Sequence, residues 1–589
     1  MDPAYSIQDQ ISFATDCIQV LLTNMRTVSL VSSEDALPSL HSFDRLLLET
    51  SAFVRSYTNS ITPVNRLPAE VLSDIFSLAS LTPFHPGYPL RPEGRYQSSR
   101  ILQTQIMRVC RQWRDVAQST TPLWSDIILL PYRGIPLSSQ IRWAGTTSIN
   151  VYSEGHVNPL VPILAEHAHR IRRLHIRTID SFWIDMDRRI HAVFAILPRL
   201  ALHIEELVLH AWKIHWCPPT ASVFSGCAPR LRVLSLFQLA FVPTDHFPAL
   251  RELYIVLQNA VEQSQLLDML RGSPMLELIH IAAPRVELPP NGAPSSRVPS
   301  LPHLRAIVLC FSRNTHCLLS DLVLPPKGCL VRLQEIALHE VSYCLEALEG
   351  RLDAGQLTKL SWNKGSGMGY ISSREVLYVT LCNAAADSGL TFGISLHGQP
   401  ASAFKAVFSQ AFSACPLYAH VTELSVFDKR DLVKSELLDS LRSLTTINHI
   451  FAAPKPRKLC GRARRKRREA PRVPVLAQAA SGGAVVCPTL HTLYLIGCDA
   501  AELTNACDIL RFRKEAGRPL TRLGIDCSAH FREDVDALRD LVDELDVAVT
   551  DELGYEAMKW GNGEPKGEWR SHSARARYQW PQWQEFREV

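Results

Sequence analysis

One short apolar pattern returns along most of this chain and limits what the chain can fold into. The pattern is [LIV]-x-x-[LI]-x-[LIVW], and its copies mostly lie about 19–33 residues apart. Each interval leaves room for a turn, a helix and a loop, so the pattern predicts alternating short strands and helices. The copies are Ile171–Ile176, Ile204–Leu209, Leu231–Leu236, Leu250–Ile255, Leu276–Ile281, Leu304–Leu309, Leu333–Leu338, Leu357–Trp362, the looser Leu390–Leu396, Val421–Val426, Leu490–Leu495 and Leu520–Ile525.

This spacing resembles that of leucine-rich repeats. The resemblance implies an irregular, horseshoe-like α/β solenoid over residues 128–555, in which each strand–helix unit buries its apolar residues against the next. A doubly wound α/β sheet also alternates strands and helices, but it does not need the same leucine spacing in every strand. We therefore expect an α+β or α/β chain whose C-terminal part is a leucine-rich-repeat-like solenoid.

In such repeats, the residue between the last two apolar positions faces the inner surface of the sheet. Arg173, His175 and Arg177 form a basic corner near the start of this surface, and Tyr254 and Tyr494 are its aromatic members. These five residues are the candidate substrate surface, and an ordinary solvated sheet face is the alternative. The expected inner row is His175, Val208, Ser235, Tyr254, His280, Val308, Ala337, Ser361, Ser425, Tyr494 and Gly524.

A second pattern precedes the repeats, at residues 61–127. It consists of L-P-A-E-V-L-S-D-I-F from Leu67, then V-C-R-Q-W-R from Val109, then P-L-W from Pro122. The apolar residues of the first segment share one helix face, and Pro68 suits the first position of that helix. A second helix is expected from about residue 99 to 118. The three segments, in this order, resemble the F-box of fungal F-box-like proteins, which implies an all-α module after a helical segment at residues 1–60.

The F-box resemblance implies two protein partners, a Skp-type adaptor and the cullin scaffold of a ubiquitin ligase, while the repeats would hold an unknown protein substrate. A scaffold protein of the nucleus with the same fold is the alternative. In either case we expect no enzymatic activity of the chain itself. The residues implied in adaptor binding are Leu67, Pro68, Val71, Leu72, Ile75 and Phe76, together with Val109, Cys110 and Trp113, which the module core would share.

The positive charge of the chain is concentrated in one segment. Residues 455–472 hold ten Lys/Arg and one Glu, and the rest of the chain has 52 Lys/Arg against 57 Asp/Glu. We expect residues 452–487 to be a disordered insertion, and we do not expect a general nucleic-acid surface. The core of the insertion is a candidate nuclear-localisation signal, a non-specific phosphate contact to RNA or DNA, or a solubilising loop: Arg462, Arg464, Arg465, Lys466, Arg467 and Arg468.

The C-terminal segment, residues 556–589, combines aromatic and charged residues. Large aromatic side chains seldom stay fully exposed to water, so we expect this segment to fold back onto the repeats, with a linear docking motif as the alternative. Its aromatic residues are Trp560, Trp569, Tyr578, Trp580, Trp583 and Phe586.

The remaining motifs point to no catalytic, cofactor or metal site. The cysteines show no zinc-like spacing, and no apolar run is long enough for a membrane span. Gly365–Gly369 reads as a loop before a helix at residues 372–385, but its spacing differs from that of phosphate-binding loops. We therefore expect a protein of the cytoplasm, the nucleus or both, without cofactors or membrane contact.

Overall fold

The fold is that of a computed structural model. The chain divides into two compact units: unit 1 holds residues 1–81 and 99–123, and unit 2 holds residues 82–98 and 124–589. The residues that the structure describes are 9, 12–13, 15–20, 23, 36–80, 103–129, 135–154, 160–177, 186–210, 221–288, 298–311, 313–325, 329–352, 357–368, 373–383, 388–395, 415–427, 444–450, 485–498, 500–527, 535 and 538–549.

The described part of unit 1 is helical. α3 follows Pro68, whose carbonyl accepts the amide of Leu72 at 3.1 Å. Glu70 lies in the first turn of α3, where a negative charge favours the helix dipole. The elements are α2 (Ala36–Ile61), the 3-10 turn η1 (Pro63–Arg66), α3 (Ala69–Ser80), a helical stretch at 103–109, and α5 (Arg111–Ser119).

The expectation of one continuous helix over residues 99–118 is wrong at Cys110. The backbone of Cys110 is extended, and its Sγ accepts the amide of Trp113 at 3.5 Å as the N-cap of α5. The helix at 103–109 therefore ends before Cys110, and α5 starts after it. Apolar periodicity continues through a break of this kind, so the periodicity alone does not reveal it.

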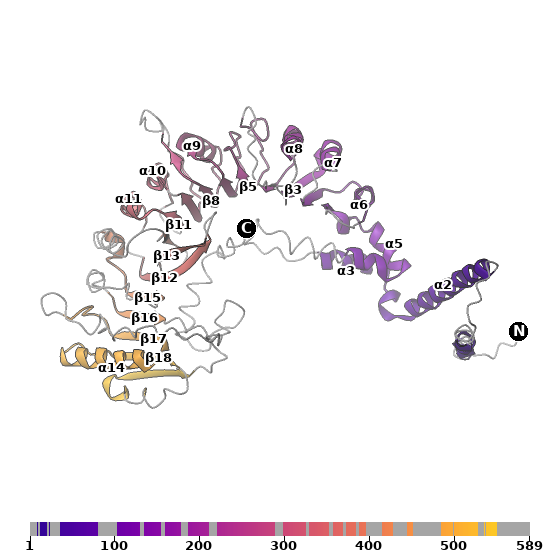
Figure 1. The fold of residues 1–589 in the computed structure, drawn as a ribbon. Helices are drawn as coiled ribbons and strands as arrows, with labels where there is room; N and C mark the ends of the chain where they lie inside the picture. Colours follow the sequence, from indigo (N-terminus) through magenta and orange to yellow (C-terminus); the bar gives the residue numbers. More distant parts are fainter. Residues whose placement is uncertain are drawn as a thin grey trace. The chain divides into compact units, whose positions relative to one another are not determined.

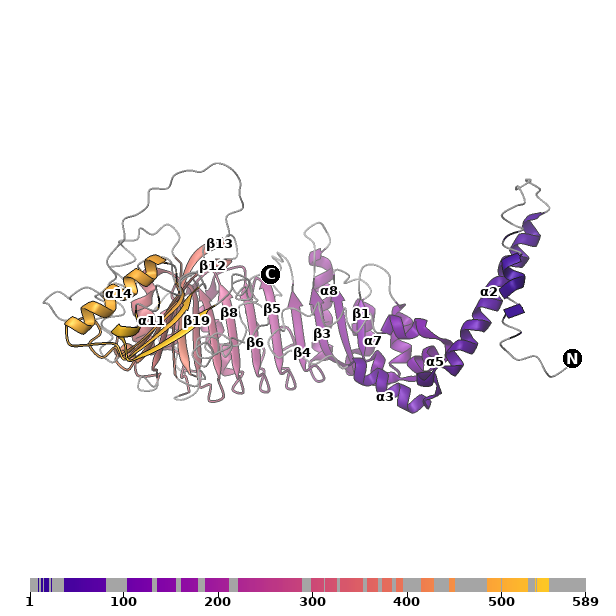
Figure 2. The ribbon, with the colours of Figure 1, turned by 90° about the horizontal axis from the view of Figure 1, so that it is seen from below.

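In its described residues, unit 2 is a mixed α/β unit built on one 17-stranded, mostly parallel sheet. Figure 2 shows the strands from β1 to β8 side by side. The strands are β1 (Asp126–Leu129), β2 (Ile149–Glu154), β3 (Ile171–Arg177), β4 (Glu206–His210), β5 (Val233–Leu239), β6 (Glu252–Leu257), β8 (Leu278–Ala283), β10 (Ala306–Phe311), β11 (Leu330–Ile336), β12 (Lys359–Met368), β13 (Ser373–Cys382), β14 (Gly389–Ser395), β15 (Glu423–Phe427), β16 (Thr446–Ile450), β17 (Thr492–Cys498), β18 (Arg522–Cys527) and β19 (Glu544–Val549).

The strands mostly follow chain order across the sheet, and all twelve predicted segments overlap strands. The exception is a reversal in which β11 pairs with β14, β14 with β13, β13 with β12, and β12 with β15. Here two expectations are wrong. Gly365 and Gly367 lie in β12 rather than in a loop, and the expected helix at 372–385 is β13, which runs antiparallel to both neighbours. The β-branched and aromatic run at 376–380 favours a strand once partners exist on both sides.

Helices cover one face of the sheet, and Figure 1 shows α8 to α11 on this face. α9 lies in one of the intervals for which the leucine spacing leaves room for a helix. The other small elements are α6 (Leu137–Trp143), α7 (Leu160–His167), α8 (Met186–Leu200), α9 (Gln263–Arg271), α10 (Thr315–Ser320), α11 (Val341–Leu348), α14 (Ala500–Glu515), the pair β7 (Val261–Glu262) and β9 (Val286–Glu287), and the 3-10 turns η2 (Thr121–Trp124), η3 (Ala168–Arg170), η4 (Leu338–Glu340), η6 (Pro416–Tyr418) and η9 (Arg539–Leu541).

Candidate functional site

The two helices α3 and α5 of unit 1 share a small core. Leu72 is 0% exposed and Phe76 is 2% exposed. The rings of Phe76 and Trp113 lie 5.1 Å apart at an angle of 55°. The indole Nε1 of Trp113 donates to the Oδ1 of the buried Asn65, whose Nδ2 donates to the carbonyl of Asn59 at 2.7 Å. Trp113 is therefore held from two sides, by an aromatic contact and by a hydrogen bond.

A different set of apolar side chains in unit 1, on α3 and on the helix at 103–109, faces outward. Val71, Ile75 and Leu78 are 41%, 42% and 67% exposed, and Val109 is 46% exposed. Val71, Ile75 and Leu78 stand at i, i+4 and i+7, which places them on one stripe of α3. We call these four residues the outer stripe. Such a row of exposed large apolar residues is typical of a helix that contacts a partner.

The structure thus separates the nine residues that the sequence grouped together. Leu72 and Phe76 are core residues, and Cys110 caps α5, so these three have structural roles in the chain alone. Pro68 is exposed and Leu67 is half-buried. Sequence reasoning missed Leu78, although its spacing of seven residues from Val71 was a signal that could have found it.

One row of side-chain positions runs across the whole sheet of unit 2, and we call it the central row. It contains every expected inner-row residue except Ala337, whose place Arg332 takes because β11 begins earlier than the leucine pattern suggests. Register pairing defines its order: Ile128, Tyr152, His175, Val208, Ser235, Tyr254, His280, Val308, Arg332, Thr391, Thr380, Ser361, Ser425, Asn448, Tyr494, Gly524 and Asp546.

The basic corner of this face contains a carboxylate that the sequence analysis did not place there. Glu206 lies 2.7 Å from the Nε2 of His175 and 3.3 Å from the Nε of Arg173. The ring of Tyr152 meets that of His175 edge-on at 4.9 Å. Burial and the charge of Arg177 lower the pKa of the neighbouring His210 to about 4. The corner is therefore a compact polar network with much of its positive charge balanced.

The two tyrosines of the candidate surface differ in their surroundings. Tyr254 is buried and donates from its hydroxyl to Glu252 at 3.1 Å, and burial together with that carboxylate raises the pKa of Tyr254. Tyr494 is half-buried, and its ring lies against Gly524, where a Cβ would meet the tyrosine Cδ1 at 2.1 Å. The guanidinium of Arg522 lies 5.9 Å from the centre of the Tyr494 ring. These two tyrosines therefore lie in separate neighbourhoods of the central row.

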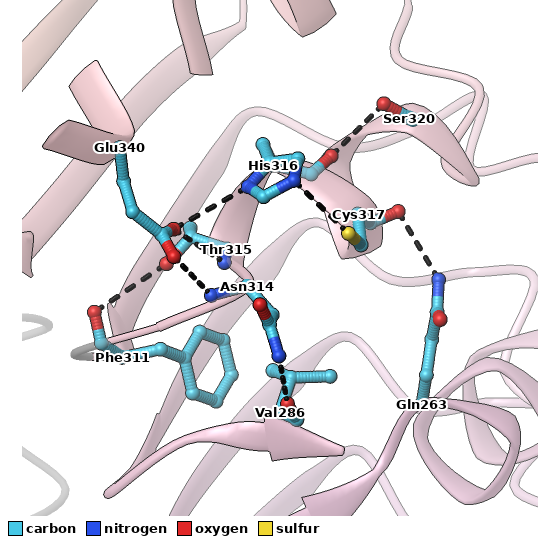
Figure 3. Close-up of polar contacts among 9 residues, drawn as sticks. All are labelled: Gln263, Val286, Phe311, Asn314, Thr315, His316, Cys317, Ser320 and Glu340. Carbon is cyan, nitrogen blue, oxygen red and sulfur yellow. Dashed lines mark hydrogen bonds and ion pairs between the residues drawn. The ribbon is translucent and has the colours of Figure 1, made fainter. Parts of the chain in front are cut away.

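A cluster beside α10 contains a cysteine, a histidine and a glutamate in contact (Figure 3). The Nε2 of His316 lies 3.2 Å from the Sγ of Cys317, and its Nδ1 lies 3.4 Å from Glu340. Glu340 accepts the amides of Asn314 and Thr315 at 2.6 and 3.2 Å, which caps the start of α10. Burial, Glu340 and Asp321 raise the pKa of Cys317, so the thiol is held protonated and is a poor nucleophile. The contacts of Glu340 therefore form a cap at the N-terminus of α10.

The described residues form neither a metal-binding cluster nor a membrane-spanning helix. No group of three or more His, Cys, Asp and Glu side chains in this part of the chain is arranged to hold a metal ion. None of the described helices combines the length and apolarity that a bilayer span requires. The candidate nuclear-localisation run Arg462–Arg468 and the C-terminal segment lie outside the described residues.

The comparisons with known proteins give no relative for this geometry. No family model matches the chain, and no curated protein matches it significantly. The features of the chain that bear on function are therefore the outer stripe of unit 1 and the central row of unit 2.

Proposed function

We propose that this chain is a substrate-recognition adaptor of a cullin–RING ubiquitin ligase. In this proposal, unit 1 is an F-box-like module that binds a Skp-type adaptor, and the leucine-rich-repeat-like sheet of unit 2 binds a protein substrate. The observation that carries the proposal is the outer stripe, which stays exposed although Leu72 and Phe76 are already buried in the core of unit 1.

The outer stripe has the form expected of a helix that docks into an apolar groove. Contacts at i, i+4 and i+7 are the anchors by which an amphipathic helix occupies such a groove. Full burial of a valine or isoleucine side chain contributes roughly 1.5–3 kcal/mol. Val71, Ile75 and Leu78 are about half exposed or more, so a partner can still gain a sizeable part of that free energy.

The proposed role requires no bond chemistry from this chain. A protein that binds an adaptor at one unit and a substrate at the other raises the effective concentration of the substrate near the conjugating enzyme. A long sheet with a varied row of side chains suits the recognition of one protein surface, because repeat sheets offer extended binding faces.

Co-purification of the full chain with a Skp-type adaptor and a cullin tests the proposal. The variant Val71→Asp/Ile75→Asp should lose both proteins, since it places charges on the outer stripe and leaves Leu72 and Phe76 in place. Leu202→Asp is the matched control, because Leu202 is also an exposed apolar residue, at 65%, and lies in unit 2. Failure of the unaltered chain to bind the adaptor would refute the proposal.

A nuclear scaffold protein with the same fold is the second candidate function. The observation that favours it is the basic run within residues 455–472, which has the composition of a nuclear-localisation signal. Deletion of 455–472 should then remove the protein from the nucleus, and purification of the full chain should recover no cullin. Recovery of a cullin would favour the ligase instead.

A further inference from the structure

The helix α2 of unit 1 exposes most of its large apolar side chains to water. It is one long helix (Figure 2), and its described side chains are exposed or half-buried. A helix that is apolar over a wide face normally packs against another element. Among the described elements, however, the main contact of α2 is with the short turn η1 at its C-terminal end. The exposed residues are Leu46 (59%), Leu48 (64%), Phe53 (72%), Val54 (50%), Tyr57 (40%) and Ile61 (51%).

The apolar residues of α2 recur at the spacing of a coiled-coil helix. Five of them, with Thr50 in the one remaining place, alternate at steps of three and four residues. These are the a and d positions of a heptad, which line one side of a helix and pack on a second helix. Leu46 and Phe53 each precede an a position and widen the same side. We call this side the α2 seam, and its a and d residues are Phe43, Leu47, Thr50, Val54, Tyr57 and Ile61.

The described residues leave most of the α2 seam uncovered. The helical stretch within residues 9–23 is the nearest candidate for a cover, since it precedes α2 and would form a hairpin with it. Phe13 and Val20 in this stretch are themselves 71% and 60% exposed. A hairpin would bury apolar side chains on both of its helices, whereas both helices expose theirs. The seam is therefore available to a partner outside the chain.

The charges of α2 favour a second copy of the helix over a membrane surface. α2 contains two acidic and two basic residues, so two copies approach without net charge. Of the positions that flank the seam, only Asp44 is charged, and no like charges oppose each other there. Helices that lie on a lipid surface carry many lysines and arginines on their polar face. α2 has no lysine, and the Nε of Arg45 already lies 3.9 Å from the Oε1 of Glu49.

The exposed area of the seam matches what a stable dimer needs. Five side chains on this side are 40–72% exposed: Leu46, Phe53, Val54, Tyr57 and Ile61. Since a large aromatic side chain can bury roughly 150–250 Å², each of the five has roughly 100 Å² left to bury. Two copies together would then bury roughly 1,000 Å², which is the lower limit for a specific protein interface. The helix is about 39 Å long, so these contacts extend along one continuous seam.

We infer that two copies of this chain associate through the α2 seam. The interface is isologous, because both copies contribute the same residues. The dimer contains two copies of unit 2, so a partner with two binding sites is held more tightly than by one chain. The inference goes beyond the ligase proposal and does not rest on it, because its tests need no adaptor, cullin or substrate.

Sedimentation equilibrium of the full-length protein tests the inference. The unaltered chain at micromolar concentration should sediment with twice the 66.0 kDa mass of one chain. Val54→Glu/Tyr57→Glu should sediment as a single chain, since it places charges on the seam. Leu48→Glu is the matched control and should remain a dimer, because Leu48 is exposed on the same helix but lies outside the seam. A single-chain mass for the unaltered protein, or a dimer of the double variant, would overturn the inference.

Photo-cross-linking provides a second measurement, which does not depend on how the double variant folds. A benzophenone side chain at Phe53 of a tagged copy should cross-link to α2 peptides of an untagged copy. The same probe at Leu48 is the control and should give far fewer cross-links between copies. Cross-links from position 53 only within one chain would show that another segment covers the seam, and would contradict the inference. Cross-links to added phosphatidylserine vesicles, with none between copies, would contradict it as well.

Discussion

Replacing Gly524 by alanine tests how closely the side chains of the central row pack on one another. Gly524 has an ordinary strand backbone, so alanine by itself should stabilise β18 by about 0.5–1 kcal/mol. The Cβ, however, would stand 2.1 Å from the Cδ1 and 2.6 Å from the Cε1 of Tyr494. The ring has to leave its place, which costs about 1–3 kcal/mol in a packed site.

The backbone contribution of alanine and the cost of displacing the ring have opposite signs, and the presence of the Tyr494 ring determines which of them is larger. In the unaltered chain we expect Gly524→Ala to destabilise the region by about 1–2 kcal/mol, because the half-buried Tyr494 can swing partly outward and loses its contact with Arg522. In a Tyr494→Ala background the same change should stabilise by up to about 1 kcal/mol. The coupling free energy between the two sites is then about 2 kcal/mol.

Native-state hydrogen exchange is the suitable assay, since a chain of two units does not unfold in one step and local opening must be measured. Amides of β17 and β18 should exchange about 5- to 30-fold faster in the single variant Gly524→Ala and no faster in the double variant than in Tyr494→Ala. An equal effect of Gly524→Ala in both backgrounds would refute the packing of Tyr494 on Gly524.

Three further predictions concern buried groups. Burial and Arg332 lower the pKa of His280 to about 3. The unfolded chain therefore binds a proton at this histidine below about pH 6.5, and the folded chain does not. The free energy of unfolding should fall by at most about 1.4 kcal/mol per pH unit as the pH drops from 6.5 towards 3. His280→Leu should flatten this pH dependence, measured by urea titrations at pH 7.5 and 5. Glu340→Ala should destabilise α10 by about 1–3 kcal/mol, seen as faster exchange of its first amides, while Glu340→Gln retains part of the cap. Leu72→Ala should cost about 2–5 kcal/mol of unit 1 stability by thermal unfolding, and Ile75→Ala much less.

The leucine spacing predicted the strands well because each copy describes local contacts that repeat. The leucine spacing failed where pairing with residues distant in the sequence determines the local structure. Gly365 and Gly367 suggest a loop to a local reading, yet β13 pairs with them along the whole of β12. The apolar residues of β11 are compatible with two registers. Pairing with β10 and β14 fixes the register in which Arg332, rather than Ala337, lies in the central row.

The candidate sites show the same limit. The sequence placed Leu72 and Ile75 on one helix stripe, but only packing against Trp113 and its neighbours separates the buried residue from the exposed one. The basic corner was visible from Arg173 and His175, whereas Glu206 comes from the next strand and is brought there by the sheet register. β16 was missed because His449 stands where the pattern, after Leu444 and Ile447, requires its last apolar residue.

Binding of a purified Skp-type adaptor to the full chain, measured by calorimetry, tests the proposed function most directly. The unaltered chain and Leu202→Asp should bind alike. Val71→Asp/Ile75→Asp should weaken binding by about 100-fold or more, because buried apolar anchors at an interface each contribute about 2 kcal/mol or more. Unchanged hydrogen exchange of the α5 amides would show that unit 1 of the double variant is folded. Equal binding by the variant and the unaltered chain, or no binding by either, would contradict the adaptor role.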